Sequence, residues 1–177
     1  MSGTPAWVRL ELDVAAFDPA PFVGALAACA EAGVLVTTLA ELGDTPEHRR
    51  DLYELNRECS ADIPGRGPFH TWEEYRRLRL EVPCFDAAGV VLAVDGDRWC
   101  GMSASSDHRA AGFAFNEMTG VRAGYRGRGL SLAMKVRGVA YARALGVGVV
   151  RTVHHPGNAV AIAMNRRLGY RDAGPWD

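Results

Sequence analysis

Apolar and charged residues alternate with a period of two from Val8 to Val14. This alternation predicts a half-buried strand over residues 7–14. Asp95-Gly96-Asp97-Arg98 separates two later apolar runs and predicts a hairpin. Runs rich in apolar and β-branched residues predict further strands at 34–39, 90–94, 99–103, 111–121 and 147–153.

Capping residues and apolar stripes mark the predicted helices. Thr45 and Thr71 each precede a helical stretch and can accept one of its first free amide N–H groups. Gly146 and Gly169 supply C-terminal stops. The segment 60–70 is rich in proline and glycine and predicts a loop. The predicted helices cover 22–32, 46–59, 72–80, 130–145 and 158–169, the last capped by Asn158.

Composition limits the classes of protein to consider. At 177 residues, with 48% apolar and 23% charged residues, the chain fits one soluble domain. A net charge of −1 argues against a general nucleic-acid binder. Four cysteines without a Cys-x-x-Cys pair argue against a zinc site or a disulfide scaffold. No signal peptide and no apolar run of about 18 residues is apparent, so we expect a cytoplasmic protein without a membrane partner.

The segment from Val121 to Ser131, VRAGYRGRGLS, joins a predicted strand to a predicted helix. A glycine-rich turn at this point leaves backbone N–H groups free at the positive end of the helix dipole, which favours a diphosphate. Arg126 and Arg128 add positive charge beside the turn. The alternative is an ordinary capping loop with surface arginines.

Two common phosphate-binding motifs do not fit this segment. A P-loop closes with Lys-Ser or Lys-Thr, whereas the only lysine of the chain is Lys135, a turn further along the helix. A dinucleotide-binding fingerprint needs a third glycine at position 132, which is Leu132. The sequence therefore favours a different class of phosphate-bearing ligand.

Two motifs carry a family resemblance. The first, Arg126-Gly-Arg-Gly129-Leu-Ser131, resembles the Arg/Gln-x-x-Gly-x-Gly/Ala signature of the GNAT acyltransferase superfamily. The second, NAVAIAMNRRLGY from Asn158 to Tyr170, resembles the Asn-x-x-Ala…Leu-Gly-Phe helix of the same superfamily. They occur in the expected order, with a helix and a strand between them. The resemblance is specific over about residues 110–171 and weaker before them.

The resemblance implies an α/β (α+β) protein with the GNAT fold. Its central sheet would be mixed and mostly antiparallel, flanked by helices, with a splayed strand pair holding the cofactor. Residues 34–177 would form the acyltransferase domain, and residues 1–33 a strand–helix extension packed on it. Members usually end with two further strands, for which this chain is too short. We hypothesise that the strand at residues 7–14 takes the place of the missing C-terminal one.

The resemblance also implies a site for acetyl-coenzyme A or a longer acyl-coenzyme A. The glycine-rich loop would hold the pyrophosphate, and the strand before it the pantetheine arm. A backbone N–H near Thr119 is the candidate oxyanion donor, and Gly120 would allow a β-bulge, with a simple strand bend as the alternative. We expect no metal. The expected cofactor-binding residues are Thr119, Val121, Arg126, Gly127, Arg128, Gly129, Leu130, Ser131 and Asn158.

Glu117 is our first candidate for a catalytic residue. It lies on the same predicted strand and would act as the general base on the attacking amine, directly or through water. The alternative is a solvated strand glutamate without a catalytic role. Asp107, His108 and Glu73 are weaker candidates for the base.

Asn165 is our second candidate for a catalytic residue. It lies two helical turns after Asn158, which we expect to cap the helix and also to touch the cofactor. By resemblance, Asn165 stands where many relatives have the tyrosine that protonates the leaving thiolate. An amide can donate a hydrogen bond to sulfur but is not an acid near neutral pH. The alternative is that Asn165 bonds only to backbone.

Residues for the acyl acceptor are harder to assign. His154 and His155 are neighbours at a strand end, so their side chains point to opposite faces and do not easily chelate one metal. Either one of them lines the acceptor pocket or both simply end the strand. By resemblance, the loop at 60–70, with Asp62, Arg66 and His70, shapes the acceptor site.

The sequence therefore predicts a cytoplasmic acyl-coenzyme A–dependent N-acyltransferase. It would transfer an acetyl group to a primary amine by direct attack in a ternary complex, with a small molecule as the favoured acceptor. A peptide N-terminus, a protein lysine and a hydroxyl are alternative acceptors. A non-catalytic acyl-coenzyme A sensor or partner domain is the alternative function. We expect no nucleic-acid partner, and an open sheet edge leaves room for a homodimer.

Overall fold

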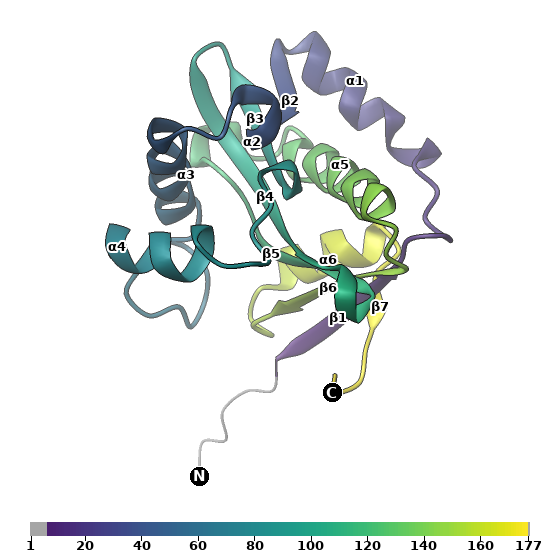
Figure 1. Ribbon diagram of the computed structural model, residues 1–177. Helices are drawn as coiled ribbons and strands as arrows, with labels where there is room; N and C mark the ends of the chain where they lie inside the picture. The colour runs from purple at the N-terminus through teal and green to yellow at the C-terminus, as the bar shows by residue number, and fades with distance from the viewer. Residues whose placement is uncertain (1–6, 177) are drawn as a thin grey trace.

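A computed structural model describes residues 7–176 and places them in one sheet with helices on both faces (Figure 1). Short 3-10 turns cover residues 20–22, 87–89, 109–111 and 123–125, and a π-helical turn at Arg76–Leu80 continues α4. The helices are α1 (Val23–Glu31), α2 (Leu39–Leu42), α3 (Pro46–Cys59), α4 (Trp72–Tyr75), α5 (Leu130–Leu145) and α6 (Ala159–Arg167). The strands are β1 (Val8–Asp13), β2 (Val34–Thr38), β3 (Val90–Asp95), β4 (Arg98–His108), β5 (Phe113–Val121), β6 (Val149–His154) and β7 (Arg171–Asp172).

The helices begin and end where the capping signals predicted. Thr45 accepts a hydrogen bond from the N–H of His48 at 3.2 Å, and Thr71 forms a capping box with Glu74. Gly146 ends α5 with φ of 76°, in the left-handed region that favours glycine. The structure adds the unpredicted α2 and β7 and extends β4 to His108.

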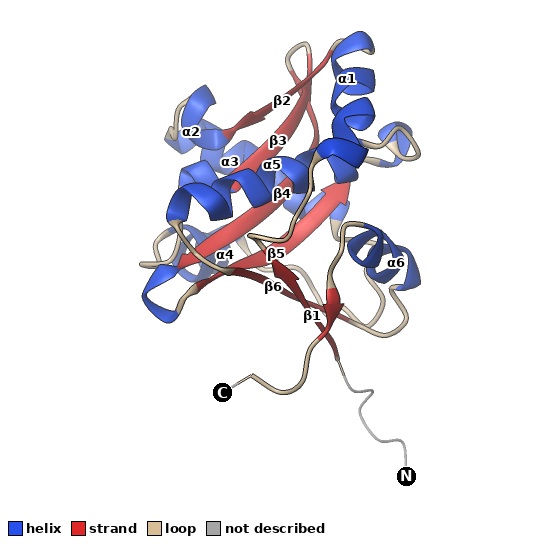
Figure 2. Cartoon of the chain, turned by 90° about the vertical axis from the view of Figure 1, so that its right-hand side faces the viewer, coloured by secondary structure: helices blue, strands red, loops and turns tan. Residues whose placement is uncertain are grey.

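The strand order is β2-β3-β4-β5-β6-β1-β7, and Figure 2 shows β1 and β2 toward opposite ends of the sheet. Only β5 and β6 run parallel, so the sheet is mixed and mostly antiparallel, as predicted. Strand β1 pairs with β6 from Val8↔His154 to Asp13↔Val149, and β7 pairs with β1. The N-terminal strand therefore extends the sheet beyond β6. This confirms that the predicted strand at residues 7–14 is paired in the sheet, as our hypothesis requires.

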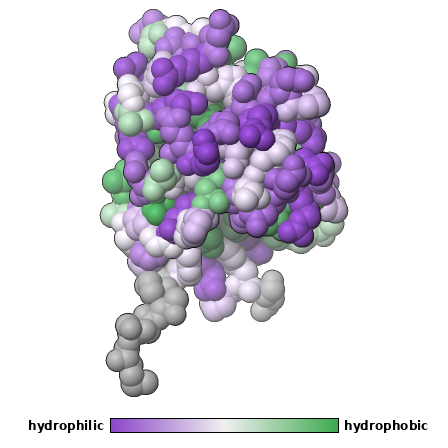
Figure 3. Space-filling model, turned by 90° about the vertical axis from the view of Figure 1, so that its left-hand side faces the viewer, coloured by the Kyte–Doolittle hydropathy of each residue, from purple (hydrophilic) through white to green (hydrophobic). Residues whose placement is uncertain are grey.

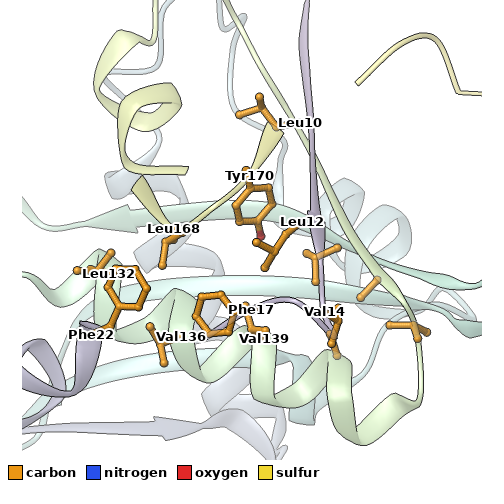
Figure 4. Packing of buried hydrophobic residues seen from close by; sticks show 14 residues of the cluster. Leu10, Leu12, Val14, Phe17, Phe22, Leu132, Val136, Val139, Leu168 and Tyr170 are labelled. Atoms are coloured by element: carbon orange, nitrogen blue, oxygen red, sulfur yellow. The ribbon is translucent and has the colours of Figure 1, made fainter. Parts of the chain in front are cut away.

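The helices pack on both faces of the sheet through separate apolar clusters. Helices α3 and α4 cover one face, and α1 and α5 the other (Figure 1). Figure 4 shows the cluster that joins β1 to α5, which includes Leu10 and Leu12 of β1 and Val136 and Val139 of α5. Leu168, just after α6, is buried in the same cluster. Hydrophilic residues cover most of the α3–α4 side, with small apolar patches between them (Figure 3).

Residues of the predicted N-terminal extension are part of this core. Leu10 is fully buried in the β1–α5 cluster, and Cys29 of α1 is buried against β2 and α5. The division into residues 1–33 and 34–177 stays a prediction.

We expect Leu10→Ala to destabilise the protein by about 2–5 kcal/mol, because it removes a fully buried side chain and leaves a cavity. Chemical denaturation monitored by circular dichroism measures this change. Leu35→Ala is the matched control, since Leu35 also lies on a strand but is 57% exposed, and it should change stability by less than about 0.5 kcal/mol. Equal effects of the two substitutions would contradict the packing described for β1.

Strands β5 and β6 separate soon after they begin. They pair only from Phe113↔Val149 to Phe115↔Arg151, although β5 continues to Val121. The splayed strand pair predicted from the family resemblance is therefore present.

The bulge in β5 lies at Glu117, so the predicted bulge at Gly120 was wrong. Ser105 pairs with Asn116 and Ala104 with Met118, which leaves Glu117 as the extra residue. The bulge turns Asn116 toward α5 while Met118 packs toward α3. Gly120 has a different requirement, because a Cβ there would lie 2.7 Å from the Cβ of Cys59 in α3.

Candidate active site

A cavity of about 460 Å³ lies at the splay and is lined by residues from both sides of the sheet. Its wall on the α5–α6 side includes Lys135, Asn158 and Met164. Its wall on the other side includes Arg79 and the loop at 63–70. Side chains from both faces of the sheet therefore border one cavity between β5 and β6.

Strand β5 directs backbone groups of Thr119 and Val121 into the splay. The N–H of Arg122 donates to the carbonyl of Cys100 at 2.9 Å, so these two residues form a hydrogen-bonded pair. Because bonded and non-bonded pairs alternate along an antiparallel ladder, Ser103↔Thr119 and its neighbour Gly101↔Val121 are non-bonded. The N–H groups of Thr119 and Val121 thus point away from β4, where β6 has already separated.

The turn between β5 and α5 is exposed and presents its amides. Gly127 and Gly129 have φ of 77° and 78°, a conformation that favours glycine. The first backbone bond of the helix joins the N–H of Ala133 to the carbonyl of Gly129 at 3.0 Å. Within the described chain, no backbone acceptor is bonded to the N–H groups of residues 127–132. These amides lie at the positive end of a 16-residue helix, where an anion is stabilised.

The side chains of this turn differ in their surroundings. Arg126 donates to Asp62 at 2.9 Å and to the carbonyl of Val121 at 3.2 Å, which joins the turn to the loop at 60–70. Arg128 lies over the Tyr125 ring. Leu130 is buried beneath α1 and β2, whereas Ser131 is half-buried in the first turn of α5.

Helix α6 brings both predicted asparagines to the α5 side of the splay. Asn158 caps the helix by accepting the N–H of Ala161 at 3.4 Å, and it lines the cavity. Asn165 is fully buried and donates to the carbonyl of Ala161 at 2.9 Å. It also contacts His154 at 2.7 Å and accepts from Lys135 at 2.6 Å, so the alternative that it bonds only to backbone is wrong.

Lys135 is a site residue that we did not assign from the sequence. Its ammonium nitrogen lies 2.6 Å from Asn165 and 2.9 Å from the side-chain oxygen of Asn116, and its side chain is 3% exposed. Burial lowers the pKa of Lys135 to about 7. The signal was available, because Lys135 stands three residues after Leu132 and four before Val139, on the apolar stripe of α5.

Glu117 lies on the opposite side of the splay from Lys135. Its carboxylate accepts from Ser106 at 2.7 Å and pairs with Arg79 at 3.1 Å. The Ser106 hydroxyl also contacts the ring nitrogen Nε2 of His108 at 2.9 Å. Glu117 lines the cavity, and its side chain is 30% exposed. The carboxylate is thus oriented by two partners while one edge still faces the cavity.

The weaker candidates for the base differ in their access to the cavity. His108 reaches Glu117 only through Ser106. Asp107 pairs with Arg109, and Glu73 pairs with Arg76 at 2.9 Å. None of these three residues lines the cavity.

The two neighbouring histidines point to opposite faces, as predicted, and both line the cavity. His154 contacts Asn165, and burial, followed by the charge of Lys135, lowers the pKa of His154 to about 4. The ring of His155 instead faces Gly65 and packs edge-on against Trp7.

The loop at 60–70 forms part of the second cavity wall. Arg66 and His70 line it, and Arg66 stacks on the Phe69 ring at 4.6 Å. Asp62 does not line it, and its carboxylate is paired with Arg126.

Residues 7–176 offer neither a metal-binding cluster nor a membrane-spanning helix. No cluster of three or more His, Cys, Asp or Glu side chains is arranged to hold a metal there. No helix in that range is long and apolar enough to cross a bilayer. The expected absence of a metal stays a prediction.

Comparison with known proteins finds acetyltransferases among the relatives of this chain. The chain is 30% identical over 121 residues to mycothiol acetyltransferase of Thermobispora bispora, covering 66% of this chain and 40% of that protein. It is 35% identical over 104 residues to mycothiol acetyltransferase of Pseudarthrobacter chlorophenolicus, covering 56% and 31%. The chain thus spans less than half the length of these relatives.

A solved structure supports the fold. The GCN5-related N-acetyltransferase from Sphaerobacter thermophilus superposes with a TM-score of 0.65 at 23% identity, covering 96% of this chain and 50% of that one. The sequence profile of the acetyltransferase (GNAT) family matches residues 49–170, which is more than half of the chain and includes the glycine-rich turn, the splay and α6. This chain belongs to the GNAT acetyltransferase family.

Proposed function

We propose that this protein is an acetyl-coenzyme A–dependent N-acetyltransferase that acylates a primary amine of a small molecule by direct attack in a ternary complex. The observation that carries the proposal is the cavity at the β5–β6 splay. Glu117 and Lys135 line this cavity from opposite sides, and the backbone amides at 127–132 are available at the start of the helix that carries Lys135. Direct transfer needs both reactants in line at one point, which such a cavity supports.

The cofactor is assigned to the α5–α6 side. Backbone amides at 127–132 would hold the diphosphate, with Arg126 and Arg128 beside it. The pantetheine arm would enter the splay and bond to the backbone of Val121. The N–H of Thr119 would then donate to the oxyanion that forms at the thioester carbon.

The acceptor amine is assigned to the opposite side, next to Glu117. Its proton would pass to the Glu117 carboxylate, directly or through one water, as its nitrogen attacks the thioester. Ser106 and Arg79 orient that carboxylate through hydrogen bonds.

Acetyl-coenzyme A at 100 times its dissociation constant should stabilise the protein by about 2.7 kcal/mol, because a ligand that binds only the folded state shifts the unfolding equilibrium. Thermal unfolding with and without the ligand measures this shift. Thiol release with a panel of amines then tests catalysis. No stabilisation would refute the cofactor assignment, and binding without turnover on a broad panel would favour the alternative of a non-catalytic sensor.

The charges in the acceptor wall favour an amine that also carries an anionic group. Arg66 and Arg79 both line this wall, and Glu117 pairs with Arg79. In the part of the chain that the structure describes, Arg66 has no ion-pair partner. A guanidinium at a cavity mouth is suited to bind a carboxylate or phosphate.

Free amino acids should therefore be better acceptors than the corresponding amides, and Arg66→Met should reduce that preference by about tenfold, near 1.4 kcal/mol. The ratio of kcat/KM for each matched pair of amines measures it. Arg50→Met is the control, because Arg50 also stacks on an aromatic ring, that of Trp72, but does not line this cavity. A preference that survives in Arg66→Met would contradict this assignment.

A further inference from the structure

Lys135 is a buried cation without a counter-ion. Its nitrogen bonds to two amide oxygens, those of Asn116 and Asn165, and lies 5.0 Å from the centre of the Tyr170 ring. Among the described residues, no carboxylate lies within ion-pairing distance of it. A buried ammonium that lacks an opposite charge is expensive in free energy. Its presence here therefore calls for a role in binding or chemistry.

The position of Lys135 is the apex of the splay. Phe115↔Arg151 is the last pair between β5 and β6, and Asn116 and Thr152 are the next residue on each strand. The hydroxyl of Thr152 donates to the carbonyl of Asn116 at 3.1 Å and closes the apex. Lys135 bonds to the side chain of that same Asn116 and forms part of the cavity wall.

Few groups on this side of the splay can supply a proton. Asn158 and Asn165 are amides and are not acids near neutral pH. His154 is held neutral, because its pKa is lowered to about 4 and its Nε2 accepts from the Asn165 amide nitrogen. Lys135 is therefore the remaining ionisable side chain in the α5–α6 wall of the cavity.

We propose that the Lys135 ammonium is the acid that stabilises and protonates the departing coenzyme A thiolate, an inference that rests on the proposed function. As the acceptor nitrogen bonds to the acyl carbon, the carbon–sulfur bond breaks and its electron pair goes to sulfur. A proton then moves from the Lys135 nitrogen to that sulfur. The amine proton goes to Glu117 on the other side, and Lys135 regains a proton from water.

The groups around Lys135 determine how its role depends on pH. His154 faces it from β6 through Asn165, and Tyr170 faces it from the segment after α6. From β5 and β4 come the neutral side chains of Asn116, Thr119 and Ser103. Glu117 faces the opposite side, bonded to Arg79. Because the acid must carry its proton, its contribution is present below the lowered pKa of Lys135 and is lost as the pH rises through about 7.

The direct test is the ionisation of the thiol of bound coenzyme A. Ultraviolet difference spectra against bound desulfo-coenzyme A follow the thiolate as a function of pH. In the natural protein the thiol should ionise at least about one pH unit lower than in Lys135→Met, a tenfold change, because the thiolate and the Lys135 ammonium titrate as a pair and each stabilises the charged form of the other. Arg137→Met is the control, since it removes a positive charge from the exposed side of the same helix.

The rate profile gives an independent test. Lys135→Met should lower kcat about 10²-fold at neutral pH. Its kcat should also lack the fall around pH 7 that we expect for the natural protein. Lys135→Arg keeps the charge but holds its proton, so it should keep the lowered thiol pKa of bound coenzyme A and still lose rate. This variant also serves if Lys135→Met does not fold.

The outcomes separate the two proposals. Calorimetry with coenzyme A tests the proposed function, and if the natural protein does not bind it, both proposals fail. If coenzyme A binds but its thiol ionises at the same pH in the natural protein and in Lys135→Met, only the role of Lys135 is overturned. Unchanged kcat in Lys135→Met would overturn it equally.

Discussion

The double variant Arg126→Glu/Gly129→Asp should lose coenzyme A binding, with affinity reduced by about 10³-fold or more. Two carboxylates would then stand against the diphosphate. Like charges brought together cost several kcal/mol, and a 10³-fold loss of affinity corresponds to about 4 kcal/mol. The turn is exposed, so the new charges meet the ligand rather than the core. Isothermal titration calorimetry with coenzyme A measures the loss.

Two controls separate charge from backbone strain. Gly129→Ala introduces the strain of a side chain at φ of 78° without a charge. Gly146→Asp places the same acidic side chain at φ of 76° in open space at the far end of α5. Both controls should retain coenzyme A binding far better than the double variant. Unchanged affinity in the double variant would refute the assigned diphosphate site.

Glu117→Gln should reduce kcat by about 10²-fold or more and leave the affinity for acetyl-coenzyme A unchanged. The amide keeps the shape of the side chain and its contact with Ser106, but it cannot take a proton from the amine. Steady-state kinetics with a reactive amine and calorimetry with the cofactor measure the two effects.

Glu11→Gln is the matched control for this substitution. Glu11 is also a strand glutamate paired with an arginine, Arg151 at 2.8 Å, and the two carboxylate side chains have similar exposure, 33% for Glu11 and 30% for Glu117. It lies on β1 and does not line the cavity, so its kcat should be unchanged. If both variants keep full activity, Glu117 is a solvated strand residue and another base must act.

Local sequence signals located most of the fold. Thr45, Thr71 and Gly146 act on the backbone within a few residues of themselves, so their effects can be read without knowledge of the tertiary structure. The alternation from Val8 to Val14 likewise reports a buried face directly. Gly127 and Gly129 have positive φ values, which depend only on the turn in which these two residues lie. Their sequence pattern could therefore indicate the turn.

Features that depend on long-range pairing were not predictable in the same way. The bulge at Glu117 arises from the register between β4 and β5, and nothing near Gly120 in the sequence distinguishes the two positions. The bonds of Asn165 depend on α5 and β6, which lie 30 and 11 residues away in the chain. Lys135 was visible as a lysine on an apolar helical stripe, but its partners were not.

A structure of the protein in complex with acetyl-coenzyme A tests the central claim most directly. We expect the diphosphate of the coenzyme to accept hydrogen bonds from the amides at 127–132. We expect the thioester to lie in the splay, between Thr119 and Lys135. A coenzyme bound elsewhere on the molecule, with that turn unoccupied, would contradict the assignment of the cofactor site and of the reaction.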